Sequence, residues 1–267
     1  MSYENYISDI KEKLEKKGYS VSDKDIIKRN DIIKPAISIS RGENRFACIY
    51  YDEQLISMYG QLSPEEVMKN IERDLDVPDI MPDMKPDVKS LIESDAVSFM
   101  ILEKERNKKY LADKVWRDAG LGFVVLPYLM GPDETTAVYT KEMLKGTGIS
   151  DEYAIKTAIE KAKDNTPASI NTMFSPVVAI SNNTGVFGAA AFFYENVATD
   201  VRNMLGDYYV IPSSVHEIIA FGGDGRDPQE IKNMIHMANS NAGIVSPEDI
   251  LSDRLFRLSN DGFEEVE

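Results

Sequence analysis

Apolar side chains recur every three or four residues near the start of the chain, and alternating patterns follow. Residues 2–17 place five of them on one helical face, namely Tyr3, Tyr6, Ile7, Ile10 and Leu14. The runs KPAISISR and RFACIYYD, joined through RGEN, are rich in β-branched and aromatic residues and predict two antiparallel strands. LSPEEVMKNIERDL then predicts a helix that begins at a capping box. Residues 1–80 are therefore predicted to form an α-β-β-α lobe.

The segment VPDIMPDMKPDV, residues 77–88, is the predicted linker between this lobe and the rest of the chain. Its prolines remove backbone donors and disfavour helix at the residue before each of them. Residues 81–267 are predicted to form a larger C-terminal α+β lobe, and the alternative is that both lobes form one continuous domain.

The C-terminal lobe alternates between strand-like and helix-like patterns. Apolar runs at 96–102 and 121–130 predict strands, and 149–163 predicts a helix capped by Ser150. The last hundred residues repeat the order strand, strand, helix, at 177–181, 186–194, 195–205, 208–211, 215–221 and 227–241. Because few β-α-β crossovers occur, we predict an α+β fold with largely antiparallel sheets, helices packed on one face and β-β-α units in the C-terminal half.

The net charge of the chain indicates which classes of partner it is not expected to bind. The 267 residues include 45 acidic and 30 basic side chains, a formal net charge of -15. Such a chain repels nucleic-acid backbones and anionic lipid surfaces, so we expect neither nucleic acid nor membrane as a partner. The longest apolar run, residues 120–131, is too short to span a bilayer and contains Pro127. With a single cysteine, Cys48, and no signal-peptide pattern at the start, the chain is predicted to be soluble and cytoplasmic.

The segment YYVIPSSVHEIIAFGG, residues 208–223, holds the candidate chemistry. As a hairpin with its turn at Pro212 and Ser213, it places Ser214 and His216 on one face of the return strand and Glu217 on the other. A hydrolase could then use Ser214 as nucleophile and His216 as base, with an acid from another element. Alternatively, Ser214 and Glu217 form a capping box that begins a short helix. Both structures remain open at this point.

The candidate catalytic residues are thus Ser214 and His216, and the candidate binding residues are Ser213, Ser214, His216 and Glu217. No cofactor and no metal are predicted, because the chain has two histidines and one cysteine. The glycines of FGGDGRDP, residues 221–228, match neither the dinucleotide-binding nor the P-loop spacing.

The residues AISNNTGVFGAAAFFYENV, YYVIPSSVHEII and NMIHMANSNAGIVSPEDILSDRLFRL together resemble a family of uncharacterised bacterial proteins, a domain of unknown function. The resemblance rests on an Asn-containing turn at 182, an I/L-P-S-S-x-H-E core at 211–217, a helix ending in Asn, and Leu251 to Asp253. It is strongest over residues 140–258 and implies no established activity, fold or cofactor.

Missing catalytic signatures, strong acidity and a mixed aromatic composition favour a non-enzymatic module that binds another protein or regulates it. The alternative is the hydrolase that uses Ser214 and His216.

Overall fold

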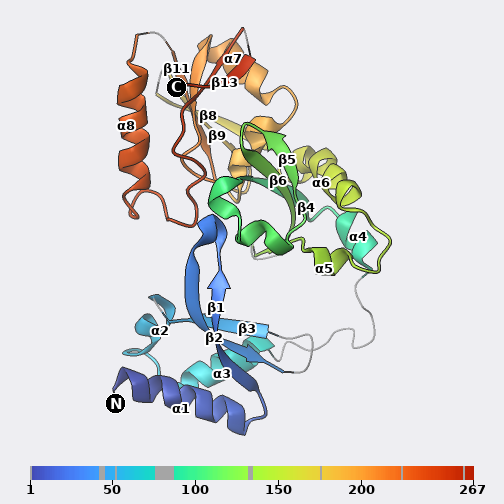
Figure 1. The fold of residues 1–267 in the computed structure, drawn as a ribbon, viewed down its shortest axis with the longest axis vertical. Coiled ribbons are helices and arrows are strands. Elements are labelled where there is room, and N and C mark those ends of the chain that lie inside the picture. Colours follow the sequence, from blue (N-terminus) through green and yellow to red (C-terminus); the bar gives the residue numbers. More distant parts are fainter. Residues whose placement is uncertain are drawn as a thin grey trace. The chain divides into compact units, whose positions relative to one another are not determined.

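The computed structural model describes residues 2–41, 46–51, 53–75, 87–131, 135–174, 176–223, 225–260 and 262–267. It divides into two compact units (Figure 1). Unit 1 comprises residues 1–28 and 32–84, and unit 2 comprises residues 29–31 and 85–267. The predicted linker lies outside the described residues except for its last two positions. The predicted α+β class with antiparallel sheets is confirmed.

Unit 1 packs helices against a three-stranded antiparallel sheet in the order β1-β2-β3. Its elements are α1 (Tyr3–Lys16), β1 (Ser20–Ile27), β2 (Ile33–Ser40), β3 (Phe46–Tyr50), α2 (Glu53–Met58) and α3 (Pro64–Leu75). Tyr6, Ile10 and Leu14 of α1 are buried against the sheet, as the helical spacing predicts. Strand β1 was not predicted, because SVSDKDII is mostly polar and exposed and is held by pairing with β2.

Unit 2 contains a first sheet in which β6 pairs with β4, β5 and β7. The elements of this part are α4 (Val88–Ile92), β4 (Val97–Glu103), η2 (Glu105–Asn107), η3 (Tyr110–Asp113), β5 (Arg117–Gly120), β6 (Phe123–Met130), β7 (Thr136–Val138), α5 (Lys141–Leu144) and α6 (Asp151–Asn165). Strands β4 and β6 are buried along nearly their whole length, which explains their continuous apolar runs.

A second sheet of unit 2 has six antiparallel strands in the order β13-β12-β10-β11-β9-β8. Its strands and the helices among them are β8 (Ala168–Phe174), β9 (Val177–Asn182), η4 (Gly188–Phe193), α7 (Val197–Leu205), β10 (Tyr208–Ile211), β11 (Ile218–Gly222), α8 (Pro228–Asn239), β12 (Phe256–Ser259) and β13 (Gly262–Glu265). Strand β8 therefore lies at one edge of this sheet and β13 at the other.

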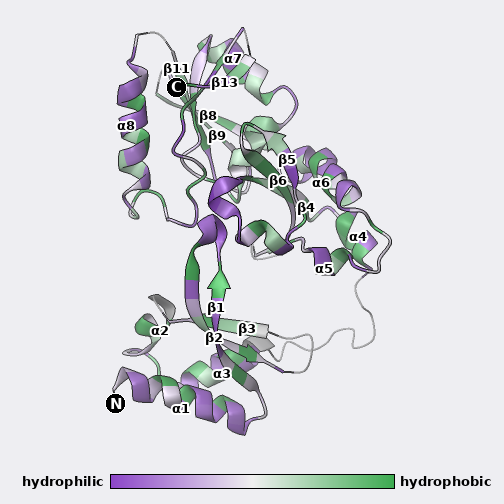
Figure 2. Cartoon of the chain, viewed as in Figure 1, coloured by the Kyte–Doolittle hydropathy of each residue, from purple (hydrophilic) through white to green (hydrophobic). Residues whose placement is uncertain are grey.

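Both faces of the six-stranded sheet carry buried apolar side chains. Ile180, Tyr208 and Ile218 point into the main core with β4, β6 and α6, whereas alternate residues such as Tyr209 and Phe221 meet α8. The ribbon shows α8 on the side of this sheet away from α6 (Figure 1). Helix α8 carries hydrophilic and hydrophobic residues along its length (Figure 2), as an amphipathic helix covering a sheet must.

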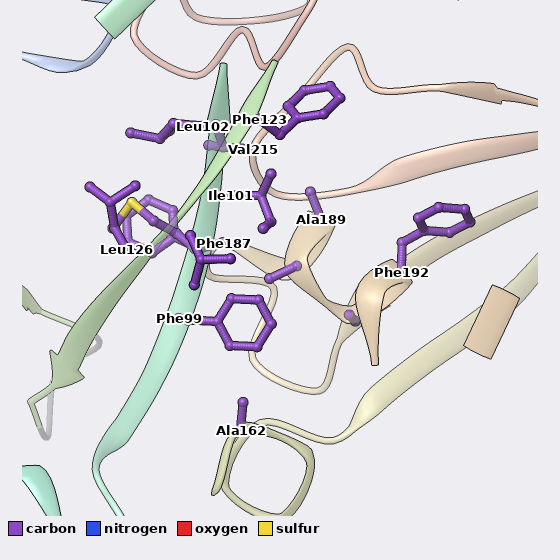
Figure 3. Packing of buried hydrophobic residues seen from close by; sticks show 14 of the residues in the cluster. Phe99, Ile101, Leu102, Phe123, Leu126, Ala162, Phe187, Ala189, Phe192 and Val215 are labelled. Atoms are coloured by element: carbon purple, nitrogen blue, oxygen red, sulfur yellow. The ribbon is translucent and has the colours of Figure 1, made fainter. Parts of the chain in front are cut away.

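Two predicted elements of this region are wrong. Residues 186–194, predicted as a strand, contain the short helix η4, whose three alanines are fully buried. The predicted return strand 215–221 begins only at Ile218. Phe187 before η4, Ala189 within it and Val215 before β11 pack with Ile101 and Phe99 of β4 in the main core (Figure 3). Across the described residues, no helix has the length and apolarity that crossing a membrane requires.

Candidate functional site

A tight turn at residues 182–187 prepares the surroundings of His216. The Asn182 side chain accepts hydrogen bonds from the backbone N–H groups of Thr184 and Gly185 at 3.1 and 2.8 Å, and donates one to the Val186 carbonyl at 2.8 Å. Asn182 is buried, so these bonds satisfy its amide without water. The turn ends with Phe187 in the left-handed region at φ 50°, which directs its backbone N–H toward His216.

His216 lies in the six-residue connection between β10 and β11. Its Nδ1 accepts a hydrogen bond from the Phe187 N–H at 3.2 Å, and its Nε2 lies 3.5 Å from Oδ1 of Asp249. The Gly185 carbonyl is also 3.1 Å from Nδ1, but an Nδ1 that accepts from Phe187 carries no proton to give it. We therefore assign the Nε2–H tautomer, in which the ring stacks on Phe187 at a centroid distance of 5.7 Å and bonds to Asp249.

Asp249 joins His216 to Arg29. The guanidinium of Arg29 donates to Oδ1 of Asp249 at 2.5 Å and to the Glu248 carbonyl at 3.1 Å, and it lies 5.0 Å over the Phe187 ring. Partial burial raises the pKa of the Asp249 carboxyl, but the hydrogen bonds from His216 and Arg29 and the positive charge of Arg29 hold it below its ordinary value. Asp249 is therefore a carboxylate that fixes both neighbours.

Residues 29–31 belong to unit 2, and all three side chains bind there. Asn30 donates from Nδ2 to the carbonyls of Pro247 and Ile250, each at 2.8 Å. Asp31 accepts from the backbone N–H groups of Lys109 and Tyr110 at 2.9 Å each, so it caps the short helix η3. Asn30 and Asp31 both have positive φ, a conformation that Asn and Asp tolerate better than other residues with side chains.

Of the remaining predicted site residues, Ser213 and Ser214 form hydrogen bonds with backbone N–H groups and Glu217 faces solvent. The Ser214 hydroxyl accepts from the backbone N–H of His216 at 3.1 Å, not from its ring. The Ser213 carbonyl accepts from the Leu251 N–H at 3.2 Å, and Glu217 is exposed to solvent. Residues 214 and 250 also form a backbone bridge. The connection 212–217 is thus clamped against residues 249–252 and is neither a tight hairpin turn nor a helix start.

This geometry leaves His216 little capacity for catalysis. A general base needs one ring nitrogen free to take a proton from a nucleophile, and here Nδ1 is occupied by Phe187 and Nε2 faces Asp249. Ser214 and His216 are neighbours, but no bond joins the hydroxyl to the ring among the interactions of the described residues. Asp249 is the acid from another element that a triad requires, yet its partner, a serine bonded to the ring, is missing from the described part of the chain.

Close packing also marks this segment as architectural. Ser181 donates from Oγ to the His216 carbonyl at 2.8 Å. A Cβ on Gly188 would lie 2.0 Å from Ser181 Oγ, 2.5 Å from the His216 carbonyl oxygen and 2.7 Å from the Asn182 nitrogen. Only glycine fits between these three groups, so the turn, η4 and the His216 connection are held against one another.

A second charged cluster lies at Asp253 and Arg254, directly after residues 249–252. Arg254 donates to Glu103 at 2.9 Å, and Arg106 pairs with Asp253 at 2.5 Å. Asn239, at the end of α8, donates to Asp253 at 2.7 Å. Burial raises the pKa of the Glu103 carboxyl, although the charges of Arg254 and Arg106 oppose that change. Sequence reasoning missed Arg29, Glu103 and Asp249, because their partners are far away along the chain and no spacing signals them.

An apolar groove opens on the α8 side of the six-stranded sheet. It has a volume of about 320 Å³ and is lined by Met173, Phe174, Val177, Ile211, Ile219, Phe221, Arg226, Ile231 and Met234. Three of its side chains are more than half exposed, namely Met173 at 58%, Phe174 at 63% and Met234 at 57%. Beneath them, Ile231 and Ile235 of α8 pack on Val177 and Phe221. No local sequence pattern predicts this groove, since strand β8, which contributes Met173 and Phe174 to its lining, was not predicted.

No group of three or more His, Cys, Asp or Glu residues among those that the structure describes could hold a metal ion. In the groove lining, the guanidinium of Arg226 lies 4.5 Å over the Phe221 ring.

Comparison with known proteins finds one family. The model of a family of unknown function (DUF5688) matches residues 174–259. The match supports the resemblance to an uncharacterised domain family, and it covers Asn182, Gly188, His216, Asp249 and nearly all the groove lining. No curated protein and no solved structure matches the chain.

Proposed function

We propose that this chain is a non-enzymatic module that binds another protein, and that the apolar groove between β8 and α8 is its binding surface. The observation that carries the proposal is the grouping of Met173, Phe174 and Met234 around one cavity, each more than half exposed to water. Exposing large apolar side chains costs free energy, about 25 cal/mol for each Å² of apolar surface, so a grouped set of them is typical of a surface that a partner covers.

The chemistry of the lining supports a protein partner. Methionine is unbranched and polarisable, so Met173 and Met234 can adapt to the shape of a bound side chain, and Phe174 supplies a rigid aromatic surface. The groove floor, by contrast, is anchored by the buried Ile231 and Ile235 of α8. A fixed floor with adaptable edges suits a segment of another protein.

The hydrolase alternative has less support. It needs a serine hydroxyl on the His216 ring, and the Ser214 hydroxyl instead accepts from the His216 backbone. The candidate binding residues Ser213, Ser214, His216 and Glu217 act in this proposal as the frame that holds β10 and β11, whose Ile211 and Ile219 reach the groove.

Photo-crosslinking tests the proposal. A benzoylphenylalanine is placed at Phe174 in the groove and, as the matched control, at Tyr153 on α6, which is 42% exposed and lies outside the lining. Both proteins are irradiated in extract of the source organism. We expect a discrete protein adduct from the Phe174 position that the Tyr153 position does not give and that Met234→Glu suppresses. The proposal would be overturned if the two positions gave identical adducts or no adducts, and the protein also turned over a hydrolysable ester in a reaction that Ser214→Ala abolishes.

A further inference from the structure

Strand β8 presents an open edge. Among the described residues it pairs only with β9, from Ala168↔Asn182 to Phe174↔Val177, so its other side carries backbone groups without a neighbouring strand. Edge strands are normally protected from pairing by lysine, by proline or by brevity. The strand is seven residues long, ASINTMF, and contains no charged residue and no proline.

The apolar groove lies at the C-terminal end of strand β8. Its lining includes Met173 and Phe174 of β8, Ile219 and Phe221 of β11, and Met234 of α8. A strand added beside β8 would send every second side chain to the groove side of the sheet, because side chains alternate between faces. An added strand would therefore satisfy the open edge and fill the groove at the same time, which a helix lying in the groove would not do.

Arg226 supplies a charge at this site. Arg29, Arg106 and Arg254 each bind a carboxylate of the chain. Arg226 has no carboxylate partner among the described residues, and its guanidinium lies over Phe221 in the groove lining. In a chain with a net charge of -15, an arginine that pairs with no carboxylate of the described residues and lines an apolar groove is suited to a carboxylate that arrives with the ligand.

We infer that the partner contributes an extended segment that adds as a strand to β8, places alternate apolar side chains in the groove and sets a carboxylate on Arg226. The inference rests on the proposed function, because it specifies how the same groove is used. It requires a peptide and not a folded surface alone, so isolated peptides suffice to test it.

The test begins with a library of random nine-residue peptides bearing free carboxyl termini, screened on the full chain. Peptides that bind are resynthesised with a single N-methyl group at each position in turn. Only every second N–H of an added strand faces β8. We expect methylation to weaken binding about ten-fold or more at alternate positions and about two-fold or less at the others, since ten-fold corresponds to one lost hydrogen bond of about 1.4 kcal/mol.

Two protein variants complete the test. Asn171→Lys puts a charge on the exposed β8 edge, and Asn203→Lys makes the same change on the exposed surface of α7. The first should weaken peptide binding about ten-fold, and the second should leave it unchanged. Arg226→Gln should weaken binding of a carboxylate peptide by a similar factor but leave its uncharged amide analogue unaffected.

Uniform loss on methylation, no loss at any position, or failure to select a peptide would overturn strand addition. If the Phe174 crosslinker captures a partner in that case, protein binding stands and only its mode is refuted. If neither peptide nor crosslinked partner is found, both proposals fail.

Discussion

Replacing Gly188 with alanine tests whether the His216 region is a close-packed frame. The φ of Gly188 is not among the positive values, so the added methyl brings no backbone strain and acts by overlap alone. That methyl would lie 2.0, 2.5 and 2.7 Å from Ser181 Oγ, the His216 carbonyl oxygen and the Asn182 nitrogen.

The size of the effect follows from these contacts. Two of the three are backbone atoms, which cannot rotate away as a flexible side chain can. Overpacking usually costs 1–3 kcal/mol, so three simultaneous overlaps predict a loss of about 3 kcal/mol or more in the free energy of unfolding. Gly243→Ala is the control, because Gly243 also has no positive φ and its added methyl would meet only Asn241 Oδ1, at 3.2 Å, so it should lose less than about 1 kcal/mol.

Urea unfolding followed by tryptophan fluorescence measures both losses. Trp116, the single tryptophan, lies in unit 2 and reports the unit that contains Gly188. With a slope of about 2 kcal/mol per molar urea, Gly188→Ala should lower the midpoint by about 1.5 M. Adding Ser181→Ala should restore less than half of the loss, since the two backbone overlaps remain. A midpoint for Gly188→Ala equal to that of Gly243→Ala would refute close packing here.

Three further changes probe separate parts of unit 2. Asp249→Asn should cost about 1–2 kcal/mol at pH 7, measured by urea unfolding. Burial raises the pKa of Asp249, but His216 and Arg29 hold it below its ordinary 3.8. The stabilisation by the Asp249 carboxylate is therefore present above about pH 4, and the difference in free energy of unfolding from wild type should vanish as pH falls below that value. A difference that stays constant down to about pH 2 would contradict this reasoning. Asp31→Ala should speed hydrogen exchange at the Tyr110 amide by about ten-fold, because the cap of η3 is lost; unchanged exchange would refute the capping role. On α8, Ile235→Ala should cost about 2–5 kcal/mol and Met237→Ala less than about 0.5 kcal/mol, because Ile235 is buried and Met237 is 73% exposed, and equal losses would contradict the groove floor.

Local patterns predicted much of the secondary structure. The three- and four-residue spacing in α1 and the capping serine of α6 lead directly to the observed helices, with Ser150 accepting from the Tyr153 N–H. The apolar runs of β4 and β6 are buried strands, as predicted. Strands β1 and β8 escaped notice because their side chains are largely polar or exposed, and pairing with a neighbour, not burial, defines them.

The candidate site depended on contacts that no local pattern contains. Strand alternation does not apply to His216 and Glu217, because β11 begins at Ile218 and the connection 212–217 is shaped by backbone bonds to residues 249–252. The partners of His216 are Phe187, on a turn fixed by Asn182, and Asp249, which is itself held by Arg29. Since these segments are far apart along the chain, the sequence identified the residue of interest and could not predict its role.

Methyl NMR of labelled methionines, recorded with the photo-captured partner, is the most direct test that the groove binds protein. Met173 and Met234 line the groove, and Met237 lies on the same helix α8 outside the lining. We predict that partner addition shifts the methyl signals of Met173 and Met234 and leaves that of Met237 in place. A bound partner that leaves Met173 and Met234 unshifted would contradict the assignment of the groove as the binding surface.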